Sequence, residues 1–164
     1  MQWIEANGAS LRCELAGDAP RTLVLIHEAG GAMESWDELM PGLQRHFRTL
    51  RYDQRGFGLS EKFRGELSVE SVVADLVGLL DALDIREPVS VLGGAFGAVM
   101  GIAFAARHPQ RVARLVACIL RSRSATGSWR RPACNMTWMP VLFFLVMRCR
   151  SLACLDSRWT LASP

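Results

Sequence analysis

In residues 1–118, short apolar runs typical of strands alternate with segments whose apolar residues recur at helical spacing, and this pattern predicts strands separated by helices. The continuous apolar run at residues 23–26 predicts a strand that is buried on both faces. Apolar side chains recur at three- and four-residue spacing after Ser68, which predicts an amphipathic helix with Ser68 at its start. Further strands are expected at residues 10–15, 47–52, 89–92 and 112–117, and further helices at residues 35–43 and 96–108. Short strands joined by crossover helices predict an α/β fold with an open, mostly parallel, doubly wound sheet.

Turn-forming residues separate these elements. Asn7 and Gly8 lie between two strand-like runs and predict an opening hairpin. Ser35 is expected to cap the helix at residues 35–43, and Pro41 lies near the middle of that helix. The hairpin and the helices together predict one continuous domain over residues 1–118.

Composition adds a division that the hydrophobic pattern alone does not show. The chain has 164 residues, half of them hydrophobic, and this is enough for one globular core. Residues 1–118 hold 12 basic and 15 acidic side chains, whereas residues 119–164 hold seven arginines and a single acid, Asp156. The arginines of this second segment are scattered rather than clustered on one face, so nucleic acid is not expected as a partner.

Neither a membrane span nor a metal site is expected from the sequence. The apolar run at residues 139–147 is interrupted by Pro140 and is much shorter than the roughly 20 residues that a spanning helix needs. The N-terminal residues lack a basic cluster followed by an apolar stretch, so a cytoplasmic location is expected. The five cysteines show no C-x-x-C spacing and predict reduced thiols, with no metal and no cofactor.

A nucleophile-elbow pattern follows the predicted strand at residues 89–92. That strand runs directly into residues 93–97, GGAFG, and then into a helix, which is the context that a G-x-S-x-G elbow requires. Glycines flank the central position because its sharp backbone bend leaves no room for neighbouring side chains. Ala95 occupies the place of the serine. A methyl group cannot attack a carbonyl carbon, so acyl-enzyme chemistry is excluded at Ala95.

Two other motifs join the elbow in a family pattern. Residues 27–31, HEAGG, resemble the His-Gly-x-Gly loop of α/β-hydrolases, and residues 51–60, RYDQRGFGLS, resemble the Tyr-Asp-x-Arg-Gly-x-Gly-x-Ser turn of that family. The helix end at residues 105–112, AARHPQRV, completes the set in the family's order. The resemblance covers residues 1–118 and implies the N-terminal part of an α/β-hydrolase fold. It implies kinship with enol-lactonases, ester hydrolases and carbon–carbon bond hydrolases.

The resemblance also implies roles for individual residues. The backbone N–H groups of Ala29 and Phe96 would form an oxyanion hole, with donors placed where negative charge develops on a substrate oxygen. Glu28 stands where the family pattern has glycine. Two interpretations of Glu28 stay open, a general acid or base beside the oxyanion hole and a solvent-facing loop residue.

Other polar side chains in the motifs are expected to be structural. His27 is expected to support its loop through hydrogen bonds rather than to act as a base. Asp53 and Arg55 are expected to form a buried pair that stabilises their turn. His46 and His108 are expected at helix ends on the surface.

The last third of the chain departs from the family pattern. The family order places an acid and then a histidine after the nucleophile, yet no histidine follows His108 and Asp156 is the sole later acid. We therefore expect a truncated, inactive copy with an irregular tail over residues 119–164. One hypothesis is that this tail is translated from a shifted reading frame. The alternative is a genuine appendage whose apolar segment, residues 141–147, packs on the sheet or on a partner.

Three functions remain open from the sequence. The first is an inactive relative of small-molecule hydrolases. The second is a non-hydrolytic lyase-type or cofactor-independent enzyme in which Glu28 acts as acid or base. The third is a ligand-binding pseudoenzyme. Each of the three takes a small molecule as substrate or ligand, and the oligomeric state is not predicted.

Overall fold

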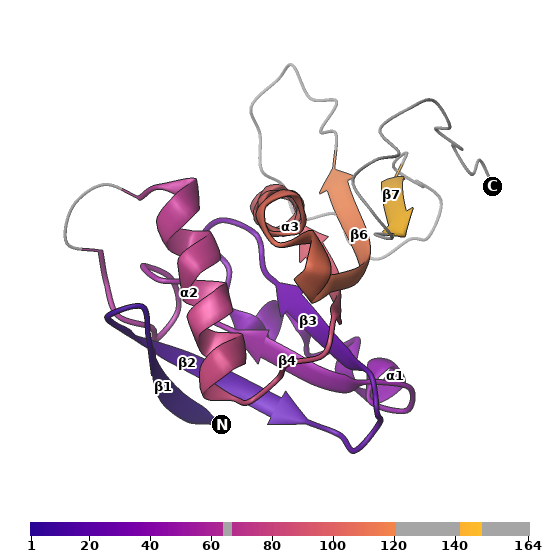
Figure 1. Ribbon diagram of the computed structural model, residues 1–164, viewed down its shortest axis with the longest axis horizontal. Coiled ribbons are helices and arrows are strands. Elements are labelled where there is room, and N and C mark those ends of the chain that lie inside the picture. Colours follow the sequence, from indigo (N-terminus) through magenta and orange to yellow (C-terminus); the bar gives the residue numbers. More distant parts are fainter. Residues whose placement is uncertain (64–66, 121–141, 149–164) are drawn as a thin grey trace, which may run out of the picture.

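A single sheet runs through the computed structural model, which describes residues 1–63, 67–120 and 142–148 (Figure 1). Its strands lie in the order β1-β2-β4-β3-β5-β6-β7. The strands are β1 (Gln2–Ala6), β2 (Ala9–Ala16), β3 (Thr22–Ile26), β4 (Arg48–Tyr52), β5 (Val89–Gly94), β6 (Val112–Leu120) and β7 (Leu142–Arg148). The helical segments are η1 (Met33–Trp36), α1 (Met40–Leu43), α2 (Val69–Ala82), α3 (Phe96–Arg107) and η2 (Pro109–Arg111).

The central strands are parallel and the outer pairs are antiparallel. β3 pairs in parallel with β4 on one side and with β5 on the other, and β5 pairs in parallel with β6. β1 with β2, β2 with β4, and β6 with β7 are antiparallel. Every residue of β3 is buried, as expected for a strand covered on both faces. The predicted α/β class with an open sheet is confirmed, and the sheet is mixed, because three of its six strand pairs are parallel and three are antiparallel.

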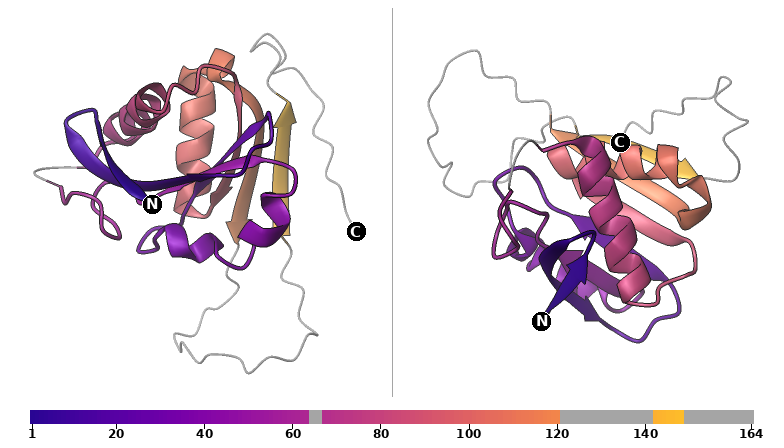
Figure 2. Two further views of the ribbon diagram at one scale, coloured as in Figure 1. Left: turned by 90° about the horizontal axis from the view of Figure 1, so that it is seen from below. Right: turned by 60° about the vertical axis from the view of Figure 1, so that its left-hand side comes forward.

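Helices cover the two faces of the sheet unequally. α2 and α3 lie on one face, and the short segments η1 and α1 lie on the other (Figure 2). The larger core joins the sheet to α2 and α3 and includes the fully buried Leu76 and Phe104. The smaller core joins Leu25 of β3 to Trp36 and Met40. Burial of each large apolar side chain stabilises the fold by about 1.5–3 kcal/mol.

The sheet contains a topological switch point between β3 and β5. The chain leaves β3 towards β4 on one side and leaves β5 towards β6 on the other. In register, Ile26 of β3 faces Gly93 of β5, so the loops that follow these two strands start at the same edge of the sheet. Open α/β sheets bind ligands at this kind of position, outside the carboxyl ends of the strands.

The start of α2 has the predicted cap. Ser68 is extended, with φ −106° and ψ 151°, and its side chain accepts a hydrogen bond from the backbone N–H of Ser71 at 3.0 Å. This bond satisfies one of the N–H groups that the first turn of a helix leaves without an intrahelical partner.

Replacing this cap tests how much the hydrogen bond contributes. Ser68→Ala is expected to lower the free energy of unfolding by about 1 kcal/mol, because the Ser71 N–H loses its side-chain acceptor. Urea titration followed by circular dichroism measures the change. Ser68→Asp supplies another capping acceptor and should remain close to the unmodified chain. Equal losses in both variants would contradict the capping role.

The expected helix at residues 35–43 is wrong. Two short segments, η1 and α1, replace it, and the residue before η1 is Ala32, which makes no side-chain cap. Pro41 lies in the first turn of α1, where its missing N–H is tolerated, so it begins a new turn instead of continuing an earlier helix. The Ser35 hydroxyl donates to Glu28 rather than capping a helix.

Two stretches beyond residue 118 lie in the sheet. β6 continues past residue 118 to Leu120, and β7 pairs with it as an antiparallel edge strand. The β7 segment is rich in aromatic, branched and other large apolar residues, and this favours a strand once an unpaired sheet edge is beside it. Residues 121–141 and 149–164, including Asp156, lie outside the described residues, so the shifted-frame hypothesis stays a prediction.

Candidate functional site

The bend between β5 and α3 has the geometry of a nucleophile elbow. Ala95 adopts φ 47° and ψ −108°, a conformation that residues with a Cβ rarely adopt. Its N–H donates to the carbonyl oxygen of Cys118 on β6 at 2.8 Å, and its own carbonyl accepts from the N–H of Ala98 at 3.0 Å. These two bonds fix the bend from the strand side and from the helix side. A methyl group therefore stands at its apex.

Close backbone contacts explain two of the glycines around Ala95. A Cβ added at Gly93 would lie 2.4 Å from the carbonyl oxygen of Gly97. A Cβ added at Gly97 would lie 2.1 Å from the carbonyl oxygen of Ile26 and 2.6 Å from that of His27. The first turn of α3 therefore lies directly against the start of the loop after β3. Only glycine permits this approach.

The loop at residues 27–31 is held by a turn and by a buried histidine. The N–H of Gly31 donates to the carbonyl of Glu28 at 3.1 Å, and Gly30 has φ 78°. His27 is fully buried, and its Nε2 accepts from the backbone N–H of Gln54 at 3.0 Å. The Gln54 side-chain amide donates to the carbonyl of His27 at 2.8 Å. This arrangement matches the supporting role expected for His27.

The two residues whose N–H groups are predicted to form an oxyanion hole lie after neighbouring strands, at the same edge of the sheet. Ala29 follows β3, and Phe96 follows β5, which is its neighbour. Within the described part of the chain, neither backbone N–H has a hydrogen-bond acceptor. Both donors are therefore available to an oxygen atom of a ligand, and their catalytic role stays a prediction.

Aromatic rings lie beside these donors. Phe57, from the turn after β4, contacts the ring of His27 edge-on with centroids 5.7 Å apart. The Phe57 ring also lies 6.3 Å from the ring of Phe96, centroid to centroid. The three rings connect the loop after β3, the turn after β4 and the elbow. The half-buried rings of Phe57 and Phe96 favour apolar ligand groups, whereas the His27 ring is fully buried.

Glu28 lies on the same loop and is half-buried. The Ser35 hydroxyl donates to Glu28 Oε1 at 2.9 Å. A Cβ added at Gly31 would lie 2.5 Å from that same carboxylate oxygen, so the side chain is folded against the loop backbone. The Ser35–Glu28 hydrogen bond is exposed, so both interpretations that the sequence left open for Glu28 stay predictions.

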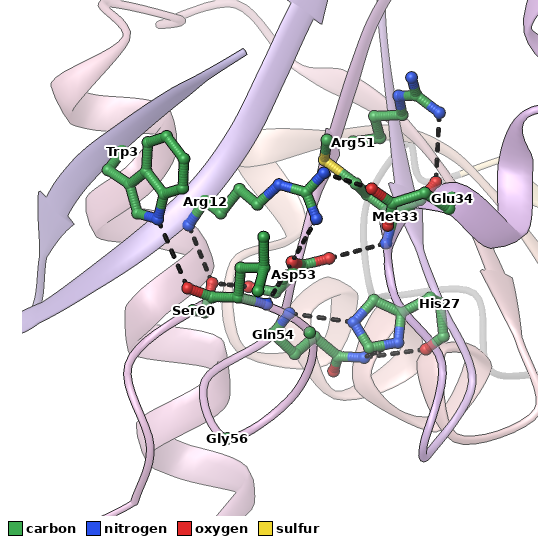
Figure 3. A network of polar contacts seen from close by, with 12 residues as sticks. Trp3, Arg12, His27, Met33, Glu34, Arg51, Asp53, Gln54, Gly56 and Ser60 are labelled. Carbon is green, nitrogen blue, oxygen red and sulfur yellow. Dashed lines mark hydrogen bonds and ion pairs between the residues drawn. The ribbon is translucent and has the colours of Figure 1, made fainter.

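A buried carboxylate organises the surroundings of the loop (Figure 3). Asp53 is fully buried and accepts from the backbone N–H of Met33 at 2.7 Å and of Leu59 at 2.8 Å. Its third partner is Arg12 of β2, with Nη1 3.2 Å from Oδ2. Because Met33 begins η1, Asp53 connects the segment after the loop to the end of β4.

The expected pair of Asp53 with Arg55 is wrong. Arg55 instead donates through Nε to Asp75 of α2 at 2.8 Å and through Nη2 to the carbonyl of Asn7 at 2.8 Å. Two separate ion pairs thus replace one, because the turn after β4 directs the two side chains to different elements. Sequence reasoning missed Arg12 and Asp75, since no local pattern relates them to the turn.

The guanidinium group of Arg12 is nearly buried, with 6% of its side chain exposed, and it also pairs with Glu34 of η1. The hydrogen bond to Glu34 is the main cause that raises the pKa of Arg12, and the nearby Asp53 carboxylate adds to it, while burial opposes the shift. Arg12 therefore stays charged and links β2, the end of β4 and η1.

Burial raises the pKa of Tyr52, the last residue of β4, and keeps its hydroxyl neutral.

Cys118 contacts the elbow through its backbone carbonyl, and its thiol lacks the lowered pKa of a reactive cysteine. Cys118 is half-buried, and its carbonyl accepts the Ala95 N–H. Burial raises the pKa of the Cys118 thiol, whereas a reactive cysteine needs a lowered pKa. Within the described residues, no group of three or more His, Cys, Asp or Glu side chains is arranged to hold a metal ion.

The sequence that forms this loop and elbow matches a known protein family. Residues 21–131 match the sequence family described as the alpha/beta hydrolase fold. The chain belongs to this family. Across the described ranges, no helix of this alpha/beta hydrolase-fold chain is long and apolar enough to cross a membrane.

Several relatives and structural neighbours are hydrolases by name. The 2-hydroxy-6-oxo-2,4-heptadienoate hydrolase of Pseudomonas putida is 42% identical over 102 residues, which is 60% of this chain and 37% of that protein. The enol-lactonase of Burkholderia xenovorans LB400 has a TM-score of 0.67 at 34% identity, covering 70% of this chain and 45% of that one. The predicted resemblance to enol-lactonases is confirmed.

A third neighbour is itself a serine-to-alanine variant. This variant of the meta-cleavage product hydrolase CumD from Pseudomonas fluorescens IP01, described as complexed with acetates, has a TM-score of 0.67 at 31% identity. The match covers 71% of this chain and 44% of that one. The chain thus spans between 37% and 45% of the lengths of the three proteins compared.

Proposed function

We propose that this alpha/beta hydrolase-fold chain binds a small carbonyl compound, of the ester, lactone or ketone class, without hydrolysing it. The observation that carries the proposal is the methyl group of Ala95 at the apex of the elbow. Acyl transfer needs an oxygen or sulfur nucleophile at that point, and alanine has neither. The Cys118 thiol is not a substitute, because burial raises its pKa.

Binding is supported by the two backbone donors. The N–H groups of Ala29 and Phe96 have no acceptor within the described residues, and Phe96 begins a helix of 12 residues. The partial positive charge at a helix start adds to the attraction for a ligand oxygen. Side-chain replacement at position 95 leaves these backbone donors in place. One relative is named for a 6-oxo compound, which is a ketone, and one structural neighbour is named for an enol-lactone. Both compounds present a carbonyl oxygen.

Two measurements on the same preparation test the proposal. With p-nitrophenyl acetate, release of nitrophenolate is expected at the rate of the buffer alone. In a titration with γ-butyrolactone followed by nitrogen-15 NMR, the backbone amide signals of Ala29 and Phe96 are expected to shift. The signal of Gly8, in the hairpin between β1 and β2, serves as the internal control and should stay in place.

Each of the two measurements has an outcome that would contradict the proposed function. Turnover above the buffer rate would exclude a non-hydrolytic role for the chain. If Glu28→Gln removed such turnover, the acid–base alternative with Glu28 would be supported instead. Unchanged Ala29 and Phe96 signals at saturating lactone would contradict binding at the two donors.

A further inference from the structure

Glu28 places a carboxylate on the loop that carries one of the two proposed donors. It directly precedes Ala29, so its backbone carbonyl and the Ala29 N–H belong to the same peptide unit. The family pattern that this loop resembles has glycine at this position. A negative charge is therefore an addition of this chain to the loop.

The carboxylate makes an exposed hydrogen bond and packs against the backbone of its loop. Ser35 donates to its Oε1 at 2.9 Å, and the side chain lies against Gly31, where an added Cβ would be 2.5 Å from Oε1. Glu28 is also half-buried. A charge fixed in partly solvated surroundings acts on a bound ligand more strongly than a mobile surface charge does.

No cation compensates Glu28 within the described residues. Its printed side-chain partner is the neutral Ser35, and no ion pair joins it to a described basic group. Arg12 is already paired with Asp53 and Glu34. The nearby guanidinium group of Arg51, which donates to the Met33 carbonyl, is paired with carboxylates of β2 and of the segment after η1. The carboxylates around these two arginines are Glu14, Glu34, Asp37 and Asp53.

From the position of Glu28 on the loop, and because no described basic group pairs with it, we propose that Glu28 selects ligands by charge. Carbonyl compounds that carry an ammonium group bind best, neutral ones bind less well, and those that carry a carboxylate bind least, which would distinguish this chain from the heptadienoate hydrolase that it resembles. The inference rests on the proposed function, because it concerns the ligand of the same loop and elbow.

Three small amides of similar size provide the test. Propionamide, β-alaninamide and succinamate share a primary amide carbonyl and are neutral, cationic and anionic at pH 7. Each is titrated into the full chain at low salt, and the Ala29 and Phe96 amide signals are followed by NMR. β-Alaninamide is expected to bind about tenfold more tightly than succinamate, with propionamide between them.

Matched variants identify Glu28 as the source of the difference. Glu28→Gln keeps the shape of the side chain and is expected to reduce the tenfold range to less than threefold. Glu38→Gln removes an exposed carboxylate outside the loop and should leave the range unchanged. In the unmodified chain, 0.5 M NaCl should also narrow the range by screening, so the test does not depend on the folding of a variant.

The outcomes separate this inference from the proposed function. Equal affinities for the three amides, or tightest binding of succinamate, would overturn charge selection while leaving carbonyl binding intact. A tenfold range that persists in Glu28→Gln would assign selection to other groups and would equally overturn the inference. Absence of any shift at Ala29 and Phe96 with all three amides would overturn charge selection, and the γ-butyrolactone titration decides the proposed function independently.

Discussion

Gly97→Ala is expected to destabilise the fold by about 3 kcal/mol or more, the upper part of the range for overpacking in a protein core. The added methyl group would lie 2.1 Å from the carbonyl oxygen of Ile26 and 2.6 Å from that of His27. Both obstacles are backbone atoms of β3 and its loop, so no side-chain rotation relieves the clash. Urea unfolding of the variant, followed by tryptophan fluorescence, measures the loss.

Gly94→Ala is the matched control for this prediction. The atom nearest to a Cβ at Gly94 is a ring carbon of Trp36 at 3.8 Å, an ordinary van der Waals distance. Its free energy of unfolding should stay within about 0.5 kcal/mol of the unmodified chain. If the two variants were equally stable, the close approach of α3 to the loop after β3 would be wrong, and with it the arrangement of the proposed site.

Asp53→Ala is expected to lower the free energy of unfolding by about 3–5 kcal/mol, as for removal of one partner from a buried ion pair. The substitution leaves the nearly buried Arg12 with Glu34 as its remaining carboxylate partner. It also leaves the N–H groups of Met33 and Leu59 without their acceptor. The same urea titration quantifies the effect.

Asp18→Ala removes an exposed aspartate in the loop between β2 and β3 and is the control. Its expected change is within about 0.5 kcal/mol. Asp53→Asn keeps the shape of the side chain and should fall between the two. A loss below 1 kcal/mol for Asp53→Ala would contradict the role of this carboxylate as the common acceptor of three segments.

Local patterns predicted the elements around the site well. The apolar run after Arg21 predicted β3 because a parallel strand covered on both faces has no polar side to interrupt it. Ser68 marked the start of α2, because a cap is a property of a few consecutive residues. The glycines around Ala95, directly after a predicted strand, predicted the bend at that residue. In each case the information lies within a few positions of the chain.

The polar connections around the site lie beyond such patterns. Arg12 and Asp53 are 41 positions apart, and they meet because β2 lies beside β4 in the sheet. Asp75 accepts a hydrogen bond from Arg55 because α2 packs against β1, and Arg55 also donates to the carbonyl of Asn7, which follows β1. Strand order decides these contacts, and the hydrophobic pattern within one segment does not specify which strands become neighbours. The same limit applies to β7, whose pairing depends on the free edge of β6.

The backbone of Ala95 has one consequence for how this protein can change. Its φ of 47° corresponds to roughly 1–3 kcal/mol of conformational strain for a residue with a Cβ. A reactive side chain at the apex would give selection a reason to keep that strain, and a methyl group does not. Glycine would relax the bend while preserving both neighbouring amides, and every alanine codon is a single nucleotide change from a glycine codon. Under the proposed binding function, drift towards glycine at this position is therefore an open evolutionary path.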